Sequence, residues 1–199
     1  IPLIIIGQKG SIMNNSLIIL EGESSNSVVT NFTFQLADCE CVEDVSIVTI
    51  KDGVSNLVIS NNKFNISNLT GDHVSLSIIK LNPSDVVSSN ILIENNDIVV
   101  DSNLSQINGI SIRKEGMGLN NQVEDIRIIN NSISIVNIKS DGTSNGINVE
   151  SSLNSLIFNN SIYIKSSTAN GILIEKSDFA IRNNSIMVDG SNYEKVLEH

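Results

Sequence analysis

Short runs in which isoleucine or valine alternates with a polar residue recur along the chain, and each contains a pair of asparagines. The clearest is IRIINNSISI at residues 126–135, and LVISNNKFNI, ILIENNDIVV, LIFNNSIYI and AIRNNSIMV repeat the pattern I-x-N-N-x-I-x-I. In an extended segment, alternation places the apolar side chains on one face and the polar side chains on the other. The pattern therefore predicts two short strands separated by an Asn-Asn corner in every repeat.

A third alternating run lies between successive asparagine pairs. It reads NGISI at 108–112, NGINV at 145–149 and NGILI at 170–174, and the runs at 44–50 and 73–78 fall in the corresponding place without the glycine. Three short strands per repeat, stacked on those of the next repeat, are typical of a parallel β-helix. We therefore predict an all-β fold, a single-stranded parallel β-helix (solenoid) of about six to seven coils.

The asparagine pair is predicted to form both the corner of each coil and the rung of a ladder. One asparagine can adopt left-handed backbone angles, because its short amide hydrogen-bonds locally. The second can point inward and bond the equivalent residue one coil above and below, which pairs polar groups that burial would otherwise leave unsatisfied. The ladder positions are Asn62, Asn96, Asn131, Asn160 and Asn184.

Alternation also predicts the core, which consists of aliphatic side chains and one phenylalanine on the inward face of the three strands. Burying each aliphatic side chain contributes on the order of 1.5–3 kcal/mol, so such a stack is stable without disulfides. The predicted core is Ile59, Phe64, Ile66, Ile93, Ile98, Val100, Ile110, Ile112, Ile128, Ile133, Ile135, Ile147, Val149, Ile157, Ile162, Ile164, Ile172, Ile174, Ile186 and Val188.

The two motifs together resemble the right-handed parallel β-helix repeat of the pectate-lyase-like superfamily, over about residues 12–190. The main alternative is a leucine-rich repeat, because LVISNNKF also fits L-x-L-x-x-N-x-L. Two features favour the β-helix. Alternation resumes directly after each asparagine pair, where a leucine-rich repeat has a helix or an irregular arc, and the N-G-I-x-I strand has no place in a leucine-rich repeat.

Residues 1–196 are expected to form a single β-helix domain, a fragment of a longer protein, and the ending LEH at 197–199 resembles the remnant of an expression tag. No apolar run approaches the roughly 20 residues that a membrane span needs, so no membrane insertion is expected of this segment. The formal net charge of −10 disfavours nucleic acid as a partner, because phosphate binding needs a concentrated basic surface.

Candidate binding residues lie on the outward face of the third strand. If the coils are in register, Arg113, Glu150 and Glu175 form a column with a spacing of about 4.8 Å, and Asn148 lies beside it. The column is either a strip that hydrogen-bonds sugar hydroxyls, with Ca²⁺ possible between the two glutamates, or a solvated charge ladder with one Arg–Glu pair. Two rows of loops flank this strand, at 67–72, 101–107, 139–144 and 165–169 before it and at 80–89, 113–124 and 151–154 after it.

Neither catalytic residues nor metal ligands are predicted from the sequence. Lyases of the resembled superfamily need clustered acids that hold Ca²⁺, and the chain has no Asp-Asp pair, G-H-G or R-I-K motif. Cys39 and Cys41 face one way in an extended segment, but zinc needs about four ligands, and only His73 and His199 supply imidazole. We expect two partly buried free thiols and no resident cofactor.

The asparagine-, serine- and isoleucine-rich repeats resemble adhesin-like cell-surface proteins. This resemblance implies a non-catalytic extracellular segment that binds a polysaccharide, a cell-surface glycan or another surface protein. One alternative is a fragment of a polysaccharide lyase or glycoside hydrolase whose catalytic coils lie partly or wholly outside this chain. A second alternative is a purely structural stalk or spacer.

Overall fold

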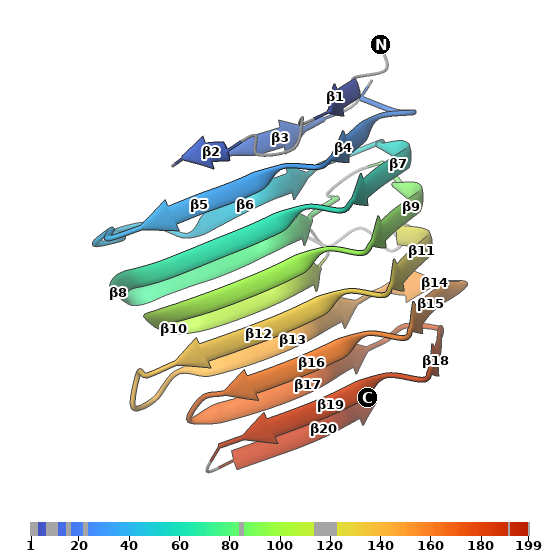
Figure 1. Cartoon of the computed structure of the whole chain (residues 1–199). Coiled ribbons are helices and arrows are strands. Elements are labelled where there is room, and N and C mark those ends of the chain that lie inside the picture. The colour runs from blue at the N-terminus through green and yellow to red at the C-terminus, as the bar shows by residue number, and fades with distance from the viewer. Residues whose placement is uncertain are drawn as a thin grey trace.

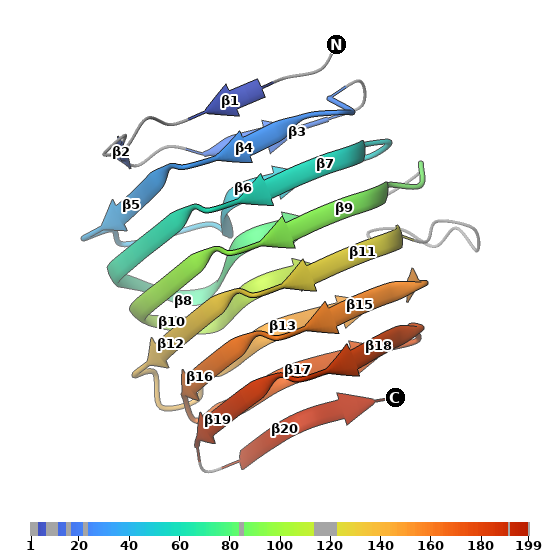
Figure 2. The same ribbon diagram turned by 45° about the vertical axis from the view of Figure 1, so that its right-hand side comes forward.

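The computed structural model describes residues 4–6, 12–14, 17–21, 24–83, 86–113, 123–190 and 192–198, and these are organised as a stack of parallel strands (Figures 1 and 2). All regular elements within these ranges are strands. No helix that is long and apolar enough to span a membrane occurs in them. The all-β parallel solenoid predicted from the alternating runs is therefore confirmed.

The strand that precedes each asparagine pair contributes to the first sheet. All pairs in this sheet are parallel, and each strand pairs with its equivalents one coil away. In spatial order the strands are β1 (Ile4–Ile6), β4 (Val28–Thr30), β7 (Ser55–Ser60), β9 (Ser89–Glu94), β11 (Val123–Ile129), β15 (Ser155–Phe158) and β18 (Phe179–Arg182), and β14 (Ser152–Leu153) also pairs with β11.

The strands that follow the asparagine pair and the N-G-I-x-I strands form a second sheet, which bends around the rest of each coil. It contains β2 (Ile12–Asn14), β3 (Ile18–Leu20), β5 (Thr33–Ala37), β6 (Val45–Ile50), β8 (Lys63–Leu81), β10 (Asp97–Ile112), β12 (Ser132–Asn137), β13 (Thr143–Glu150), β16 (Ser161–Lys165), β17 (Thr168–Glu175), β19 (Ser185–Asp189) and β20 (Asn192–Glu198). Leu197 and Glu198, predicted to belong to a tag remnant, lie in β20 and pair with Leu173 and Ile174 of β17.

In two coils the second and third predicted strands are one continuous strand. β8 and β10 stay paired through the corner, with register shifts between Asp101 and Ser102 and between Leu104 and Gln106. The prediction of loops at 67–72 and 101–107 is therefore wrong, because these residues keep their backbone hydrogen bonds to the next coil. Separate strands occur where the connection is a turn, as between β12 and β13.

The chain winds with a right-handed turn. From β4 it runs along β5, nearer the viewer in Figure 1, and returns along β6 behind it. This is the hand that parallel β-crossover connections almost always adopt. Four coils contain a fully buried ladder asparagine, so the regular solenoid has about four coils rather than the predicted six to seven. The predicted number also included the coils of β4–β6 and β18–β20, in which the ladder position is not a fully buried asparagine.

The first asparagine of each pair makes the corner. Asn61, Asn95, Asn130, Asn159 and Asn183 have φ between 54° and 56°, the left-handed region that asparagine tolerates better than most residues. This division of roles within the pair agrees with the prediction. A second column of left-handed residues starts the strands of the first sheet, at Asn26, Asn56, Asn90, Asp125 and Asn154.

The second asparagine of each pair makes the ladder. The side-chain oxygen of Asn131 accepts hydrogen bonds from both the backbone N–H and the side-chain amide of Asn96, each at 3.0 Å. Asn131 in turn donates both groups to the side-chain oxygen of Asn160, at 2.9 and 3.0 Å. The same contacts join Asn62 to Asn96 and Asn160 to Asn184. The predicted ladder is therefore confirmed.

A second buried ladder runs through the asparagines of the N-G-I-x-I strands. Asn170 donates to Asn145 at 2.7 Å, and Asn145 donates to Asn108 at 2.8 Å. Asn108 donates to the hydroxyl of Ser77 at 3.4 Å, and Ser77 pairs with it in the strand register. The glycine after each of these asparagines lets the neighbouring coil approach: a Cβ atom at Gly146 would lie 2.6 Å from the carbonyl oxygen of Gly171.

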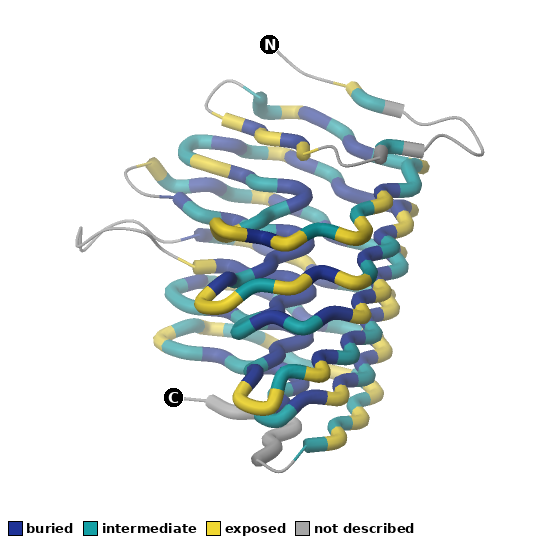
Figure 3. The backbone as a smooth tube through the Cα atoms, turned by 90° about the vertical axis from the view of Figure 1, so that its left-hand side faces the viewer, coloured by how far each residue is buried: buried dark blue, intermediate teal, exposed yellow. Residues whose placement is uncertain are grey.

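The core fills the interior between the two sheets, and buried positions alternate with exposed ones along each coil (Figure 3). Every predicted core residue is buried except Ile186 and Val188, which lie near the C-terminal end of the stack and are partly buried against the core. At the other end, the rings of Phe34 and Phe64 stack with their centroids 4.8 Å apart. One continuous hydrophobic core thus holds the coils together.

Candidate functional site

The predicted column on the third strand is present. Glu150 and Glu175 are strand partners in β13 and β17. The guanidinium Nε of Arg113 lies 3.4 Å from a carboxylate oxygen of Glu150, and the Arg113 side chain is 63% exposed. Asn148 is half-buried and pairs with Leu173. The geometry agrees with the predicted register, while a binding role for these four residues stays a prediction.

A hollow of about 440 Å³ lies on the opposite side of the third strand, where the second sheet bends. It crosses four coils, because its lining comes from the β5–β6 connection, from the middle of β8, from the middle of β10 and from the turn after β12. The lining residues are Glu40, Cys41, Val42, Thr70, Gly71, Asp72, Asn103 and Lys139. This flank was predicted to be a row of loops, and the polar residues in it were not predicted as site residues.

A second hollow of about 300 Å³ continues the first along the solenoid. It is lined by Val136, Asn137, Ile138, Lys139, Lys165, Ser166, Ser167, Asp189 and Gly190. Lys139 lines both hollows. The two hollows therefore meet at Lys139 and follow one another across the strands, along the axis of the stack. We call this surface the corner groove.

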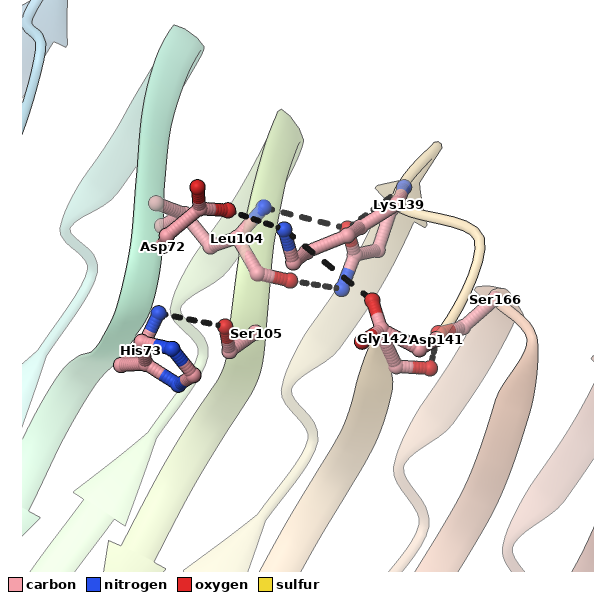
Figure 4. Close-up of polar contacts among 9 residues, drawn as sticks. Asp72, His73, Leu104, Ser105, Lys139, Asp141, Gly142 and Ser166 are labelled. Carbon is pink, nitrogen blue, oxygen red and sulfur yellow. Dashed lines mark hydrogen bonds and ion pairs between the residues drawn. The ribbon is translucent and has the colours of Figure 1, made fainter.

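Asn137 fixes the turn that carries Lys139. Figure 4 shows Lys139 with Asp72 and Asp141. The side-chain amide of Asn137 donates to the carbonyl oxygen of Leu104 at 2.9 Å, and its side-chain oxygen accepts the N–H of Leu104 at 3.3 Å. The same oxygen accepts the backbone N–H of Lys139 at 3.2 Å. The Asn137 side chain thus forms the two hydrogen bonds to the backbone of Leu104, in the preceding coil, that a strand residue would otherwise form. Gly142 is required beneath it, because a Cβ atom there would lie 2.6 Å from the Asn137 amide nitrogen.

Lys139 crosses the intervening coil to reach Asp72. Its ammonium lies 2.6 Å from a carboxylate oxygen of Asp72 and 4.0 Å from one of Asp141. The Lys139 side chain is only 17% exposed, whereas that of Asp72 is 85% exposed. The hydrogen bond and the charge of Lys139 lower the pKa of Asp72, and the hydrogen bond to Asp72 raises the pKa of Lys139. The ion pair therefore holds the ammonium group of Lys139 in a fixed position across the groove.

The ion pair predicts a pH-dependent part of the folding stability. Asp72 has a folded-state pKa below its ordinary 3.8, so its contribution is complete above that value and is lost as the pH falls through the folded-state pKa. Lys139 has a pKa above 10.5, so its contribution is present below 10.5 and is lost as the pH rises through the folded-state pKa. We expect the melting-temperature difference between the wild type and Asp72→Asn to be constant from about pH 5 to 9 and to shrink outside this window.

Thermal melts followed by circular dichroism from about pH 2 to 11 measure this difference. Asp141→Asn is the matched control, since its carboxylate lies 4.0 Å from the ammonium instead of 2.6 Å. The control should show a smaller difference at every pH. A difference for Asp72→Asn that does not change with pH would contradict the assigned role of the pair.

The corner groove is lined by hydrogen-bonding groups. Among the residues that the structure describes, no three His, Cys, Asp or Glu side chains gather in a cluster that could hold a metal ion. His73, the non-terminal histidine, is exposed, and its backbone N–H donates to the hydroxyl of Ser105 at 2.9 Å. The arrangement is suited to holding a polar ligand through hydroxyl, amide, carboxylate and ammonium groups.

Two exposed aliphatic side chains border these polar groups. Val42, in the first hollow, is 87% exposed, and Ile138, in the second, is 71% exposed. The groove thus alternates small apolar surfaces with hydrogen-bonding groups.

Comparison of the chain with models of protein families, with curated proteins and with solved structures gives no match.

Proposed function

We propose that this protein is a non-catalytic β-solenoid of the cell surface that binds a polysaccharide or cell-surface glycan along the corner groove. The observation that carries the proposal is a groove, shared by successive coils, in which Lys139, Asp72, Thr70 and Asn103 lie beside exposed aliphatic side chains. Sugars present hydroxyl groups at their edges and apolar C–H groups on their faces. Both kinds of surface find a complement in this groove.

The direction of the groove fits an extended chain ligand. Successive coils are separated by the strand spacing of about 4.8 Å, which is close to the length of one sugar unit in an extended polysaccharide. A glycan lying along the axis would therefore meet the next coil at each unit. Rigid parallel strands hold the groups at fixed intervals, so binding costs the protein little conformational entropy.

The charge of the chain selects among glycans. With a formal net charge of −10, the protein repels acidic polysaccharides and favours neutral or amino-sugar polymers. Glu40 and the Asp72–Lys139 pair give the first hollow both signs of charge. The resemblance of the repeats to pectate-lyase-like β-helices and to adhesin-like surface proteins supports a polysaccharide ligand and an extracellular location.

A glycan array, probed with the purified chain in the presence and absence of calcium, tests the proposal. We expect selective retention of neutral or amino-sugar glycans, and about tenfold weaker binding by Lys139→Met, which keeps the length of the side chain but removes its charge and donors. Arg113→Ala, on the other side of the third strand, is the control and should bind like the wild type. Circular dichroism of both variants checks that the solenoid is folded.

Other outcomes identify the alternatives. Loss of binding in Arg113→Ala and Glu150→Gln, with Lys139→Met unaffected, would move the site to the column on the third strand. Release of oligosaccharides from a retained polysaccharide would show a lyase or hydrolase. No retention at high protein concentration would overturn glycan binding and leave the solenoid as a spacer.

A further inference from the structure

Cys39 and Cys41 form a dithiol at the corner between β5 and β6. Both are free, and their sulfur atoms lie 3.5 Å apart, with the Cys41 thiol donating to the Cys39 sulfur. Cys41 is buried and Cys39 is half-buried. Their side chains point the same way, as expected for positions i and i+2 of an extended segment.

Backbone pairing to the next coil fixes this arrangement. Thr70 donates its N–H to the carbonyl oxygen of Cys39 at 3.0 Å and accepts the N–H of Cys41 at 2.7 Å. Glu40, between them, bridges Thr70 in the parallel ladder. Backbone pairing with Thr70 thus holds the two sulfur atoms side by side, within reach of one ion.

The ligand set determines which ion this pair can hold. Zinc needs about four ligands, and no third His, Cys, Asp or Glu joins the two cysteines within the described ranges. Thiolates are soft ligands that select Cu(I). Cu(I) is stable with two sulfur ligands in a linear arrangement, which small rotations of the two side chains would provide.

We propose that Cys39 and Cys41 bind one Cu(I) ion between their sulfur atoms. Binding forms two sulfur–copper bonds and releases the thiol protons, with no change in the oxidation state of copper or sulfur. The site is independent of the glycan proposal, although Cys41 also lines the first hollow of the corner groove.

The protonation of Cys41 sets the pH dependence of this site. Burial, the hydrogen bond that the Cys41 thiol donates to Cys39, and the charge of Cys39 raise the pKa of Cys41 to about 11, so near neutral pH the copper ion must displace its proton. The apparent association constant therefore rises by about tenfold or more per pH unit between pH 7 and 9. A site built from thioether or carboxylate ligands would not show this slope.

The test is anaerobic titration of the reduced full chain with Cu(I), in competition with bicinchoninate. We expect one Cu(I) per chain, a thiolate-to-copper absorption band in the near ultraviolet, and protection of both thiols from alkylation. Cys39→Ser and Cys41→Ser should each lower the apparent affinity by more than about a hundredfold, since losing a ligand costs more than losing an outer-shell partner. Cys39→Ser is the decisive variant, because Cys39 is less buried and serine is less disruptive there.

Met187→Leu is the matched control, because Met187 is 65% exposed and offers another soft sulfur ligand. It should bind copper like the wild type. Absence of bound Cu(I) at one equivalent, or equal affinity in the wild type and Cys39→Ser, would overturn the proposal. Thermal melts of each variant establish that the titrated protein is folded.

Discussion

Replacement of Asn131 by alanine is expected to lower the free energy of unfolding by about 3–5 kcal/mol. The alanine removes the acceptor for two N–H groups of Asn96 and the donor to the buried carbonyl oxygen of Ile93, 3.0 Å away. It also leaves the side-chain oxygen of Asn160 with fewer donors. Each buried polar group left without a partner costs about 1–3 kcal/mol. Urea denaturation followed by circular dichroism measures the change.

Two variants separate the ladder from the corner. Asn130→Gly keeps the left-handed backbone at φ 56° and leaves the buried ladder intact, so it should cost less than about 1 kcal/mol. Asn184→Ala should fall between the two, because Asn184 lies at the end of the ladder and is less buried. Equal stability of Asn131→Ala and Asn130→Gly would show that the ladder contributes no net stability.

Replacement of Gly146 by alanine is expected to be similarly severe, at about 3–5 kcal/mol. The added Cβ atom would lie 2.6 Å from the carbonyl oxygen of Gly171 and 2.6 Å from the Cγ2 atom of Ile162. One contact is with backbone that is fixed by pairing to the next coil, and the other is with a fully packed core side chain. Neither can move without opening the stack. The same denaturation experiment measures the loss.

Asn148→Ala is the control for Gly146→Ala, since it lies on the same strand with its side chain half-buried on the outward face. This substitution should change the free energy of unfolding by no more than about 0.5 kcal/mol. If Gly146→Ala lowered the free energy of unfolding by no more than Asn148→Ala does, the close contact between the coils at Gly146 would not limit the size of this residue.

The repeating parts of the fold could be predicted from the sequence because the same pattern of alternating residues around an asparagine pair recurs in each coil. Ile133 and Ile135 alternate directly after their asparagine pair, so strand, corner and core were all readable there. The continuity of β8 through residues 67–72 was not readable. In that segment polar residues break the alternation, and the backbone stays paired through a register shift that leaves no periodic signal.

The second ladder was not predicted, although the N-G-I-x-I strands that contain it were. The glycine of N-G-I-x-I was recognised as the start of a strand, but the asparagine before it was not recognised as a rung. In the coil above, Ser77 takes the place of Asn108, so the column of amides is not uniform in the sequence. Only the register between coils reveals that these residues form one buried chain of hydrogen bonds.

The corner groove was beyond prediction for a different reason. Lys139 and Asp72 are 67 residues apart, and their contact depends on the length of the coils between them. Those lengths differ from coil to coil, so the sequence does not fix which turns lie side by side. The predicted column of Arg113, Glu150 and Glu175 was easier, because it required only that adjacent strands keep the register of their isoleucines.

The stacking of each coil on its neighbours alone determines how this molecule comes apart. Hydrogen bonds and core contacts join a coil to the one above and the one below, so the cooperativity of unfolding is a nearest-neighbour property. A coil that is paired on one side alone opens before its neighbours, and the boundary between folded and unfolded chain then moves along the stack one coil at a time. The lifetime of the middle coils is therefore set by how many rungs protect them, and lengthening the array would slow proteolysis without strengthening any single contact.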